Sequence, residues 1–436
     1  MSAVSIGLIG VLALLILLSF KKPVAFAMAL IGLLGFGILT SFSASLHMAA
    51  VEIFNTFSSY SLSVIPMFVW MGFLAYYSGI GTDLYQFAYK MIGHWPGGLA
   101  VATQLACGTF SAICGSNTAT AATMGAISIP EMKKYKYDDS LATASIAAGG
   151  VLGVLIPPSV IFVVYGMATE QSIGRLFMSG IIPGIMLMIL YICAIIILTV
   201  RNPVLGPRGP KAGWGERFAT LKKGLAETLG VFALSMGGLF FGWFTPTEAG
   251  AVGVGGVLLM SIFRKRLSWK KLKLSLVDTT RTTAMIMMII AGANMFGKFM
   301  AVSKIPMGLA NWTASLPFHP MIIMGIIILI YLVMGLCIDA LALVLLTVPI
   351  FYPVVVFTLG YDPIWFGVIM VMVVAMGVIT PPVGMNVFVI KGIAKDVPLE
   401  TIFKGIWPFL ICILVAIAIL IIFPSIATFL PNLMLD

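Results

Sequence analysis

Two pairs of adjacent prolines mark the positions where this chain can bind an ion within a helix. Pro157-Pro158 lies in an apolar stretch and recurs 224 residues later as Pro381-Pro382. Proline lacks an N–H group, and its ring clashes with the carbonyl four residues earlier, so each pair must interrupt a helix. The carbonyl oxygens that lose their partners belong to Gly153, Val154, Gly377 and Val378.

Freed backbone carbonyls are uncharged oxygen ligands of the kind that coordinate sodium in broken membrane helices. Hydroxyl and amide oxygens of Ser111, Ser116, Asn117 and Thr380 can complete such sites. We therefore predict two sodium sites, one in each half of the chain. The alternative is a pair of proline kinks whose carbonyls bind water and neighbouring hydroxyls, as is common in membrane helices.

Two short polar segments, 114–118 and 335–339, interrupt other apolar stretches. They read Cys-Gly-Ser-Asn-Thr and Gly-Leu-Cys-Ile-Asp, and glycine with short polar side chains favours a non-helical turn. The stretches around them, 98–130 and 321–352, are too long for one membrane crossing and too short for two, because each crossing needs about 20 residues. We predict two re-entrant helical hairpins with the polar segments at their tips.

Each tip and each proline pair also begins a new helix, after Asn117, Pro158, Asp339 and Pro382. Helix N-termini carry unpaired N–H groups and the positive end of the helix dipole, and both favour anions. The apolar segments contain almost no basic side chain that could attract a carboxylate. If the four N-termini face one cavity, they can hold an anionic substrate without such a side chain.

Asp339 is the one acidic residue at a predicted hairpin tip in mid-membrane. Placing a carboxylate within the membrane costs free energy, so a residue of this kind is a candidate for a functional role. Asp339 can bind a cation, face the substrate, or only cap the helix that follows it. Asn117 and Asn386 leave a similar choice between hydrogen bonding to the substrate and helix capping.

The composition places the chain in a membrane. Of its 436 residues, 61% are hydrophobic and 9% are charged, and the mean hydropathy is +1.12. The basic residues behind the net charge of +10 lie in short loops between apolar segments, which argues against a nucleic-acid partner.

The five cysteines lie in apolar stretches without a Cys-x-x-Cys pair, so neither a disulfide framework nor a zinc site is expected. No enzyme motif such as His-Glu-x-x-His or a nucleophile elbow is present.

Basic loops set the expected orientation, because cytoplasmic loops carry an excess of Lys and Arg. The first hairpin leads into Lys133-Lys134, whereas the second leads into 352–362, which has no Lys or Arg. The two hairpins are therefore expected to enter the membrane from opposite sides, with the N-terminus in the periplasm. Ten crossings are expected, near 4–20, 23–41, 61–79, 140–168, 176–200, 226–243, 249–263, 282–298, 364–390 and 405–425.

The expected fold is an all-α inverted-topology repeat, a common design of secondary transporters. Residues 201–225 form a cytoplasmic linker between the two repeats. Segments 42–58 and 268–281 are amphipathic and are predicted to be interfacial helices, with loops as the alternative. The first repeat spans 1–200, with hairpin 98–130 and broken helix 140–168, and the second spans 226–436, with hairpin 321–352 and broken helix 364–390.

Five motifs occur in order along nearly the whole chain. They are Gly115-Ser116-Asn117-Thr118-Ala119, Ile129-Pro130-Glu131-Met132, Ile156-Pro157-Pro158-Ser159, Phe244-Thr245-Pro246-Thr247-Glu248-Ala249-Gly250 and Thr380-Pro381-Pro382-Val383-Gly384. Together with the repeat, they resemble the large membrane subunit of tripartite ATP-independent periplasmic (TRAP) transporters.

The resemblance implies an elevator carrier in the bacterial inner membrane, in which both hairpins and both broken helices move as one transport domain against a scaffold of outer helices. It also implies sodium symport of an organic acid, such as a dicarboxylate, a sialic acid or a sulfonate. A periplasmic substrate-binding protein would deliver the acid, and a small four-helix membrane subunit would brace the scaffold. Membrane lipids are further expected partners, and no cofactor besides sodium is expected.

The resemblance also assigns site residues. At Cys114 a hydroxyl would be a better side-chain ligand, so only the carbonyl of this residue is expected to bind an ion. The first sodium site maps onto Ser111, Cys114, Gly115, Ser116, Asn117, Gly153, Ile156 and Pro157, and the second onto Gly335, Asp339, Gly377, Thr380 and Val383. Substrate is expected at Asn117, Thr118, Ser159, Asp339 and Asn386.

Two other functions remain open at this point. One is a stand-alone, ion-coupled organic anion carrier of related architecture, and the other is the large subunit of a tripartite tricarboxylate transporter. A purely structural membrane anchor is not expected, because an anchor has no need of two broken helices.

Overall fold

The fold is known from a computed structural model, which describes residues 2–20, 22–221, 225–336 and 338–434. All regular elements within these residues are helices, and no strand occurs among them. The expected all-α class is therefore confirmed. Lys21 and Lys223, expected in cytoplasmic loops, and Cys337, expected in the second hairpin tip, lie outside the described residues.

The first half of the chain forms ten α-helices and one short 3₁₀ helix. Ser59 has extended backbone angles and separates α3 from the 3₁₀ helix η1 and α4. The elements are α1 (Ala3–Ser19), α2 (Val24–Leu39), α3 (Phe42–Ser58), η1 (Tyr60–Ser63), α4 (Val64–Ser78), α5 (Ile80–Ile92), α6 (Gly98–Cys114), α7 (Asn117–Lys134), α8 (Asp139–Leu155), α9 (Val160–Thr169) and α10 (Ile173–Arg201).

The described residues of the second half form ten α-helices and one π-helix. These are α12 (Ala226–Phe240), α13 (Pro246–Phe263), α14 (Trp269–Ser303), α15 (Ile305–Ser315), α16 (Pro320–Gly335), α17 (Ala340–Tyr352), the π-helix η3 (Pro353–Thr358), α18 (Pro363–Gly377), α19 (Met385–Ile393), α20 (Leu399–Ile422) and α21 (Ser425–Leu433). Helix α11 (Trp214–Thr220) lies in the linker between the halves.

One element differs from expectation. Segment 268–281 is not a separate helix, because α14 runs without interruption from Trp269 to Ser303. The segment 269–291 contains neither proline nor glycine, so nothing in it stops the helix. The corresponding part of the first half is divided at Ser59, and its amphipathic part forms α3 as expected.

The number of helices of bilayer-spanning length also differs. The described chain has seven helical segments that are long and apolar enough to cross a membrane, rather than the expected ten. Three of the seven join two elements each, namely η1 with α4, α8 with α9, and α17 with η3. The last of these, Ala340–Thr358, lies in the expected second hairpin. The helices at three of the other expected crossings, α1, α2 and α12, have 15 to 17 residues. The crossing expected at 364–390 is divided into α18 and α19, whose break lies at the second proline pair.

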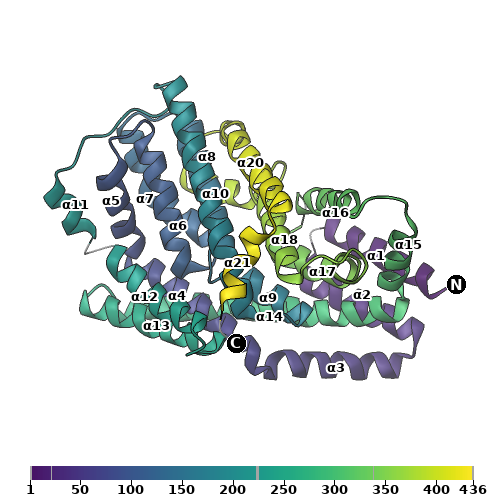
Figure 1. The fold of residues 1–436 in the computed structure, drawn as a ribbon. Coiled ribbons are helices and arrows are strands. Elements are labelled where there is room, and N and C mark those ends of the chain that lie inside the picture. The colour runs from purple at the N-terminus through teal and green to yellow at the C-terminus, as the bar shows by residue number, and fades with distance from the viewer. Residues whose placement is uncertain (1, 21, 222–224, 337, 435–436) are drawn as a thin grey trace.

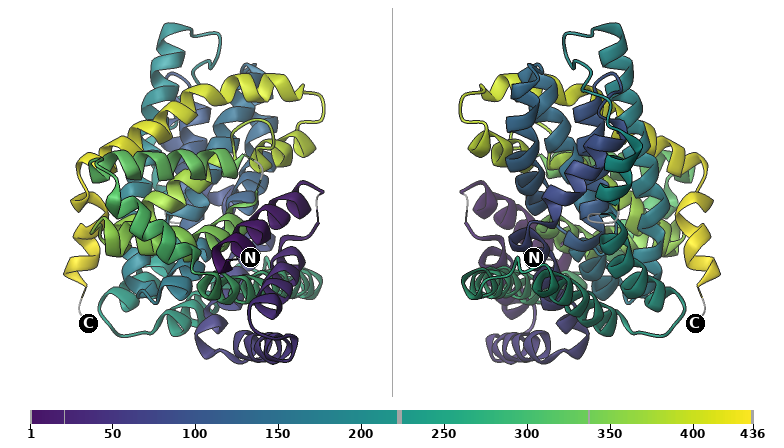
Figure 2. Two further views of the ribbon diagram at one scale, coloured as in Figure 1. Left: turned by 90° about the vertical axis from the view of Figure 1, so that its right-hand side faces the viewer. Right: turned by 90° about the vertical axis from the view of Figure 1, so that its left-hand side faces the viewer.

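Helices α4 and α14 pack against each other, and each also contacts a helix from the other half of the chain. Helix α2 lies on α14, and α13 lies on α4. In Figure 1, α3 runs along the edge of the molecule below α14, and the two termini lie apart in every view (Figures 1 and 2). The contact between α2 and α14 is close, because a Cβ atom at Gly32 would lie 2.6 Å from the backbone carbon of Met295.

The two hairpins open toward opposite ends of α10. The start of the first hairpin lies beside the C-terminal end of α10, where an ideal Cβ at Gly97 would be 2.9 Å from the Thr199 side chain. The end of the second hairpin lies beside the N-terminal end, where Gln171 donates a hydrogen bond to the hydroxyl of Tyr352 at 3.1 Å. Because α10 has 29 residues, these two places are separated by about 43 Å at about 1.5 Å per residue.

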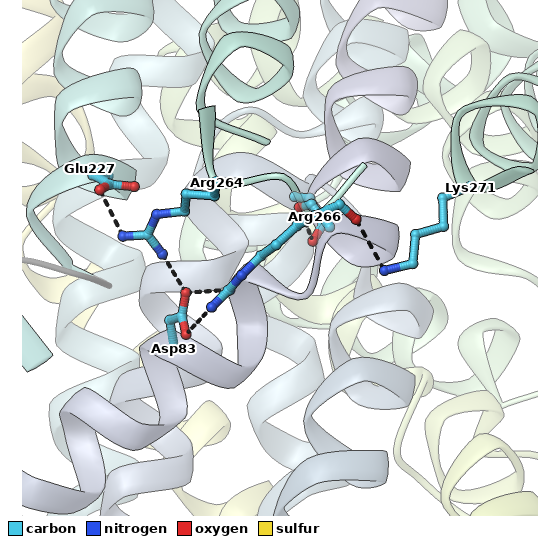
Figure 3. Close-up of polar contacts among 7 residues, drawn as sticks. Asp83, Glu227, Arg264, Arg266 and Lys271 are labelled. Atoms are coloured by element: carbon cyan, nitrogen blue, oxygen red, sulfur yellow. Dashed lines mark hydrogen bonds and ion pairs between the residues drawn. The ribbon is translucent and has the colours of Figure 1, made fainter. Parts of the chain in front are cut away.

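An ion-pair cluster joins α5 to the second half of the chain (Figure 3). Asp83 accepts hydrogen bonds from Arg264 and Arg266, each at 2.6 Å. Arg264 also contacts Glu227 of α12 at 2.7 Å, and Lys271 donates to the carbonyl of Arg266 at 3.2 Å. The Asp83 side chain is only 14% exposed, so the two guanidinium groups neutralise a carboxylate that is largely removed from solvent.

We expect Gly32→Ala to lower the thermal stability of the protein in detergent, because the added methyl group collides with the α14 backbone. Overpacking of this kind costs about 1–3 kcal/mol. Gly255→Ala in α13 is the matched control, since no atom lies within 4 Å of its Cβ position. A melting curve followed by size-exclusion fluorescence measures both, and equal melting temperatures would contradict the close α2–α14 contact.

Candidate functional site

The starts of four helices meet around one cavity of about 240 Å³. Its lining includes residues from the first turns of α7, α9, α17 and α19, as the sequence predicted for the four helix N-termini. Helices α4 and α14 close the remaining sides. The lining residues are Val69, Gly72, Phe73, Cys114, Gly115, Ser116, Asn117, Thr118, Ala119, Val154, Val160, Ile161, Thr282, Met285, Ile286, Ile289, Asp339, Ala340, Leu341 and Met385.

The first hairpin tip lies directly against the first helix break. Helix α6 ends at Cys114, and Gly115 has a φ of 66°, a left-handed conformation that suits glycine. A Cβ at Gly115 would lie 2.6 Å from the carbonyl oxygen of Pro158, and one at Gly153 would lie 2.5 Å from that of Ser116. The absence of side chains at these two glycines therefore allows the tip and the break to touch.

Most side-chain oxygens predicted for the first sodium site already have local partners. The hydroxyl of Ser111 donates to the carbonyl of Cys107 at 2.6 Å, and the amide oxygen of Asn117 accepts from Thr118 N–H at 2.8 Å. Ser116 is the N-cap of α7 and accepts from Ala119 N–H at 3.4 Å. Ile156 and Pro157 are buried in the break. The tip therefore brings together carbonyl oxygens, whereas its hydroxyls mainly shape the turn.

Thr120 was missed by the sequence analysis. Its hydroxyl is fully buried, has no hydrogen-bond partner among the described residues, and would be 2.8 Å from a Cβ at Gly153. The spacing in the sequence could have indicated this residue, because Thr120 lies one helical turn after Ser116 and so shares its face of α7. An unpaired buried oxygen beside the carbonyl of Ser116 is a candidate cation ligand.

The second tip and break repeat this close approach. A Cβ at Gly377 would lie 2.5 Å from the carbonyl oxygen of Gly335. Asp339 is the N-cap of α17, and its carboxylate accepts from Leu341 N–H at 3.1 Å while lining the cavity. Asp339 therefore caps a helix and also faces the cavity.

The prediction that the carbonyls of Gly377 and Val378 are free is wrong. The N–H of Thr380 donates to the carbonyl of Gly377 at 3.3 Å, and the N–H of Asn386 donates to that of Val378 at 3.1 Å. The prolines remove two donors, but the chain turns back at this break, so that neighbouring N–H groups replace them. The Thr380 hydroxyl donates to the carbonyl of Met376 at 2.7 Å, and the Val383 side chain is 41% exposed.

The residues predicted to bind substrate divide into two groups. Asn117, Thr118 and Asp339 line the cavity, whereas Ser159 and Asn386 do not. Ser159 caps α9 by accepting from Phe162 N–H at 3.5 Å. Asn386 is fully buried and donates to the carbonyl of Ala147 at 3.0 Å, so it joins α19 to α8 in the other half of the chain.

The cavity walls on α4 and α14 were also missed. Val69 and Phe73 of α4 and Met285 and Ile289 of α14 are apolar, so nothing in the sequence distinguishes them from residues that face lipid. Only the folded structure shows which of the apolar helices covers the hairpin tips. Thr282 is the one hydroxyl that α14 contributes to the lining.

Comparison with known proteins decides the family. A family model described as "Tripartite ATP-independent periplasmic transporter, DctM component" matches residues 10–426. The chain belongs to the DctM family of TRAP transporters. The family resemblance found in the sequence is thereby confirmed, and this DctM-family protein is the large subunit of a TRAP transporter and a multi-pass protein of the inner membrane.

Curated relatives agree over almost the full length of the chain. The C4-dicarboxylate TRAP transporter large permease protein DctM of Pseudomonas aeruginosa is 35% identical over 89% of this chain and 90% of its own. The sialic acid TRAP transporter large permease protein SiaM of Vibrio cholerae is 33% identical over 95% of both chains. The ectoine TRAP transporter large permease protein TeaC of Halomonas elongata is 31% identical over 96% of this chain and 97% of its own. These relatives are transporters, which points away from an enzyme.

Two solved structures share the fold at low sequence identity. The YdaH transporter of Alcanivorax borkumensis has a TM-score of 0.62 at 14% identity and covers 87% of this chain and 88% of its own. MtrF of Neisseria gonorrhoeae has a TM-score of 0.61 at 15% identity and covers 88% of this chain and 84% of its own. The arrangement of helices is therefore shared with these two proteins.

We expect Gly153→Ala to reduce substrate uptake at least tenfold in the reconstituted transporter, because the added methyl group separates the first tip from the first break. Gly392→Ala in α19 is the control, since no atom lies within 4 Å of its Cβ position. Both variants should elute as folded protein. Normal uptake by folded Gly153→Ala would show that the contact between tip and break is not needed for transport.

Proposed function

We propose that this DctM-family protein takes up an organic acid anion by sodium symport, after a periplasmic substrate-binding protein has delivered it. One observation carries the proposal, namely the convergence of four helix N-termini and both hairpin tips on a single cavity. Helix N-termini favour anions, and the interrupted backbone beside them presents oxygen atoms to cations. Substrate and coupling ion would thus be bound side by side.

The first sodium ion is proposed to bind between the first tip and the first break. The carbonyl oxygens of Ser116 and Pro158 lie against Gly153 and Gly115, and the unpaired hydroxyl of Thr120 is next to Gly153. A second ion is proposed near Gly335 and Gly377, with the Asp339 carboxylate as its charged neighbour. Carbonyl and hydroxyl oxygens without formal charge suit a monovalent ion in such sites.

Transport is proposed to occur by an elevator movement within an inverted repeat. The opening of the two hairpins toward opposite ends of α10 supports this topology. A periplasmic N-terminus is proposed with it, because the basic residues lie in the loops expected to be cytoplasmic. Helices α6–α9 and α16–α19 would form the moving unit, and the crossed packing of α2 on α14 and of α13 on α4 would form the scaffold. The cavity lies between these two groups, where a movement of one would carry the substrate past the other.

A small four-helix membrane subunit is the second proposed partner. Several relatives are named large permease proteins. The isethionate TRAP transporter permease protein DctMQ of Oleidesulfovibrio alaskensis is a longer chain, and the match covers 63% of it. The alternative is a stand-alone, ion-coupled organic anion carrier.

Reconstitution into liposomes tests the proposed function. We expect uptake of the delivered acid only with an inward sodium gradient, and only when the small subunit and the binding protein are both present. Proton and potassium gradients of equal size are the controls. Uptake that is unchanged without sodium would refute the coupling, and full activity of this chain alone would refute the tripartite assembly.

Two substitutions of Asp339 distinguish its role as a helix cap from the role of its negative charge in sodium binding. Asn can still cap α17, whereas Ala cannot, and loss of a cap costs about 1 kcal/mol. We expect Asp339→Asn to keep the stability of the protein but to raise the sodium concentration needed for half-maximal uptake at least tenfold. Asp339→Ala should show the same loss with a lower melting temperature. A normal sodium response of Asp339→Asn would restrict this residue to capping.

A further inference from the structure

The cavity is lined mainly by apolar side chains. Its polar side chains other than Cys114 are those of Ser116, Asn117, Thr118, Thr282 and Asp339. None of the described residues that line it is Lys, Arg or His. Aliphatic and aromatic groups from seven helices form the remaining wall, and they include Val69, Phe73, Val160, Ile161, Ile289 and Met385.

Backbone N–H groups can bind one carboxylate in this cavity. The first intrahelical hydrogen bond of α9 runs from Val163 N–H to the carbonyl of Ser159, so the N–H groups of Val160 and Ile161 have no partner within the helix. Both residues line the cavity, and Met385 holds the corresponding first position of α19. These amides provide one anion-binding end at the breaks.

The other two helix starts offer a second carboxylate fewer donors, because the N–H groups of Thr118 and Ala119 in α7 and of Leu341 in α17 already bond to the side chains of Asn117, Ser116 and Asp339. The α4 and α14 walls of the cavity are mainly apolar, and the one charged side chain in the lining is the acid Asp339. Burying an anion without a donor or a cation is costly, and a second negative charge near Asp339 adds repulsion. A dicarboxylate would therefore have to place its second charge against the apolar wall or beside Asp339.

The cavity is small for a large sugar acid. Sites for drug-sized ligands usually have volumes of about 300–1,000 Å³, and this cavity, at about 240 Å³, is below that range. A sugar acid also carries many hydroxyl groups, each of which would lose hydrogen bonds to water against Val, Ile, Met and Phe side chains.

We propose that the transported substrate is a monocarboxylate with a short apolar body, such as a linear or branched aliphatic acid. The carboxylate binds at the amide ends of the two helix breaks, and the aliphatic chain lies against α4 and α14. This assignment rests on the proposed function, because it names the substrate class of the same cavity.

A ligand series tests the class on the full-length protein in lipid nanodiscs. The readout is the shift of the melting temperature with ligand concentration, which gives the apparent Kd. The series consists of the sodium salts of acetate, butanoate, pentanoate, 4-methylpentanoate, succinate, isethionate and N-acetylneuraminate, each also measured with choline in place of sodium. We expect the affinity to rise about fourfold per added methylene from acetate to pentanoate, as burial of each group in an apolar site predicts.

A matched pair of lysine variants tests the charge argument. Thr282 lines the cavity, whereas Thr280 lies on the same helix, is exposed and is not part of the lining. We expect Thr282→Lys to improve the affinity for succinate relative to pentanoate at least tenfold, because the added ammonium group pairs with the second carboxylate. Thr280→Lys should leave this ratio unchanged.

The outcomes separate the two proposals. Tighter binding of succinate, isethionate or N-acetylneuraminate than of any aliphatic monocarboxylate would overturn the substrate class and leave sodium-coupled acid uptake standing. The same ratio of affinities in Thr282→Lys and Thr280→Lys would also count against the class. Failure of every acid to stabilise the protein in sodium would overturn the class and the proposed function together.

Discussion

The pairing of backbone hydrogen-bonding groups is the constraint on which this structure depends. A chain in hydrocarbon must satisfy every N–H and C=O group, so helices can stop in mid-membrane only where something replaces their lost partners. Here, helices stop at two tips and two breaks, and each tip lies against a break. The breaks at Pro157-Pro158 and Pro381-Pro382 are thus tolerated because the tips shield them and because side-chain caps serve three of the four new helices.

Glycine makes this shielding possible. The contacts of Gly153 with Ser116 and of Gly377 with Gly335 bring two main chains together without an intervening side chain. Close backbone approach of this kind is typical of membrane interfaces, where small residues replace the hydrophobic driving force available in water. The same residues that allow tight packing also expose carbonyl oxygens to the space between tip and break.

Features that depend on local sequence could be predicted, and features that depend on tertiary contacts could not. The proline pairs predicted the positions of both breaks, and glycine with short polar residues predicted both tips. These predictions succeeded because such residues restrict the conformation of their own backbone. The uninterrupted α14 was missed because an amphipathic pattern hid the absence of any helix breaker between Trp269 and Ala291. The carbonyl partners of Gly377 and Val378 depend on how the chain turns back, and the walls from α4 and α14 depend on which apolar helix packs beside the tips.

The division at Ser59 separates α3 from α4, whereas α14 is continuous, so the two halves are unequal copies. In a carrier whose halves exchange conformations between the inward-open and outward-open forms, identical copies would give both forms the same energy. Unequal copies remove that degeneracy, and a difference of about 1.4 kcal/mol already changes the ratio of the two populations tenfold. In the proposed transport cycle, the interruption at Ser59 is thus one difference between the halves that can favour one orientation of the empty carrier.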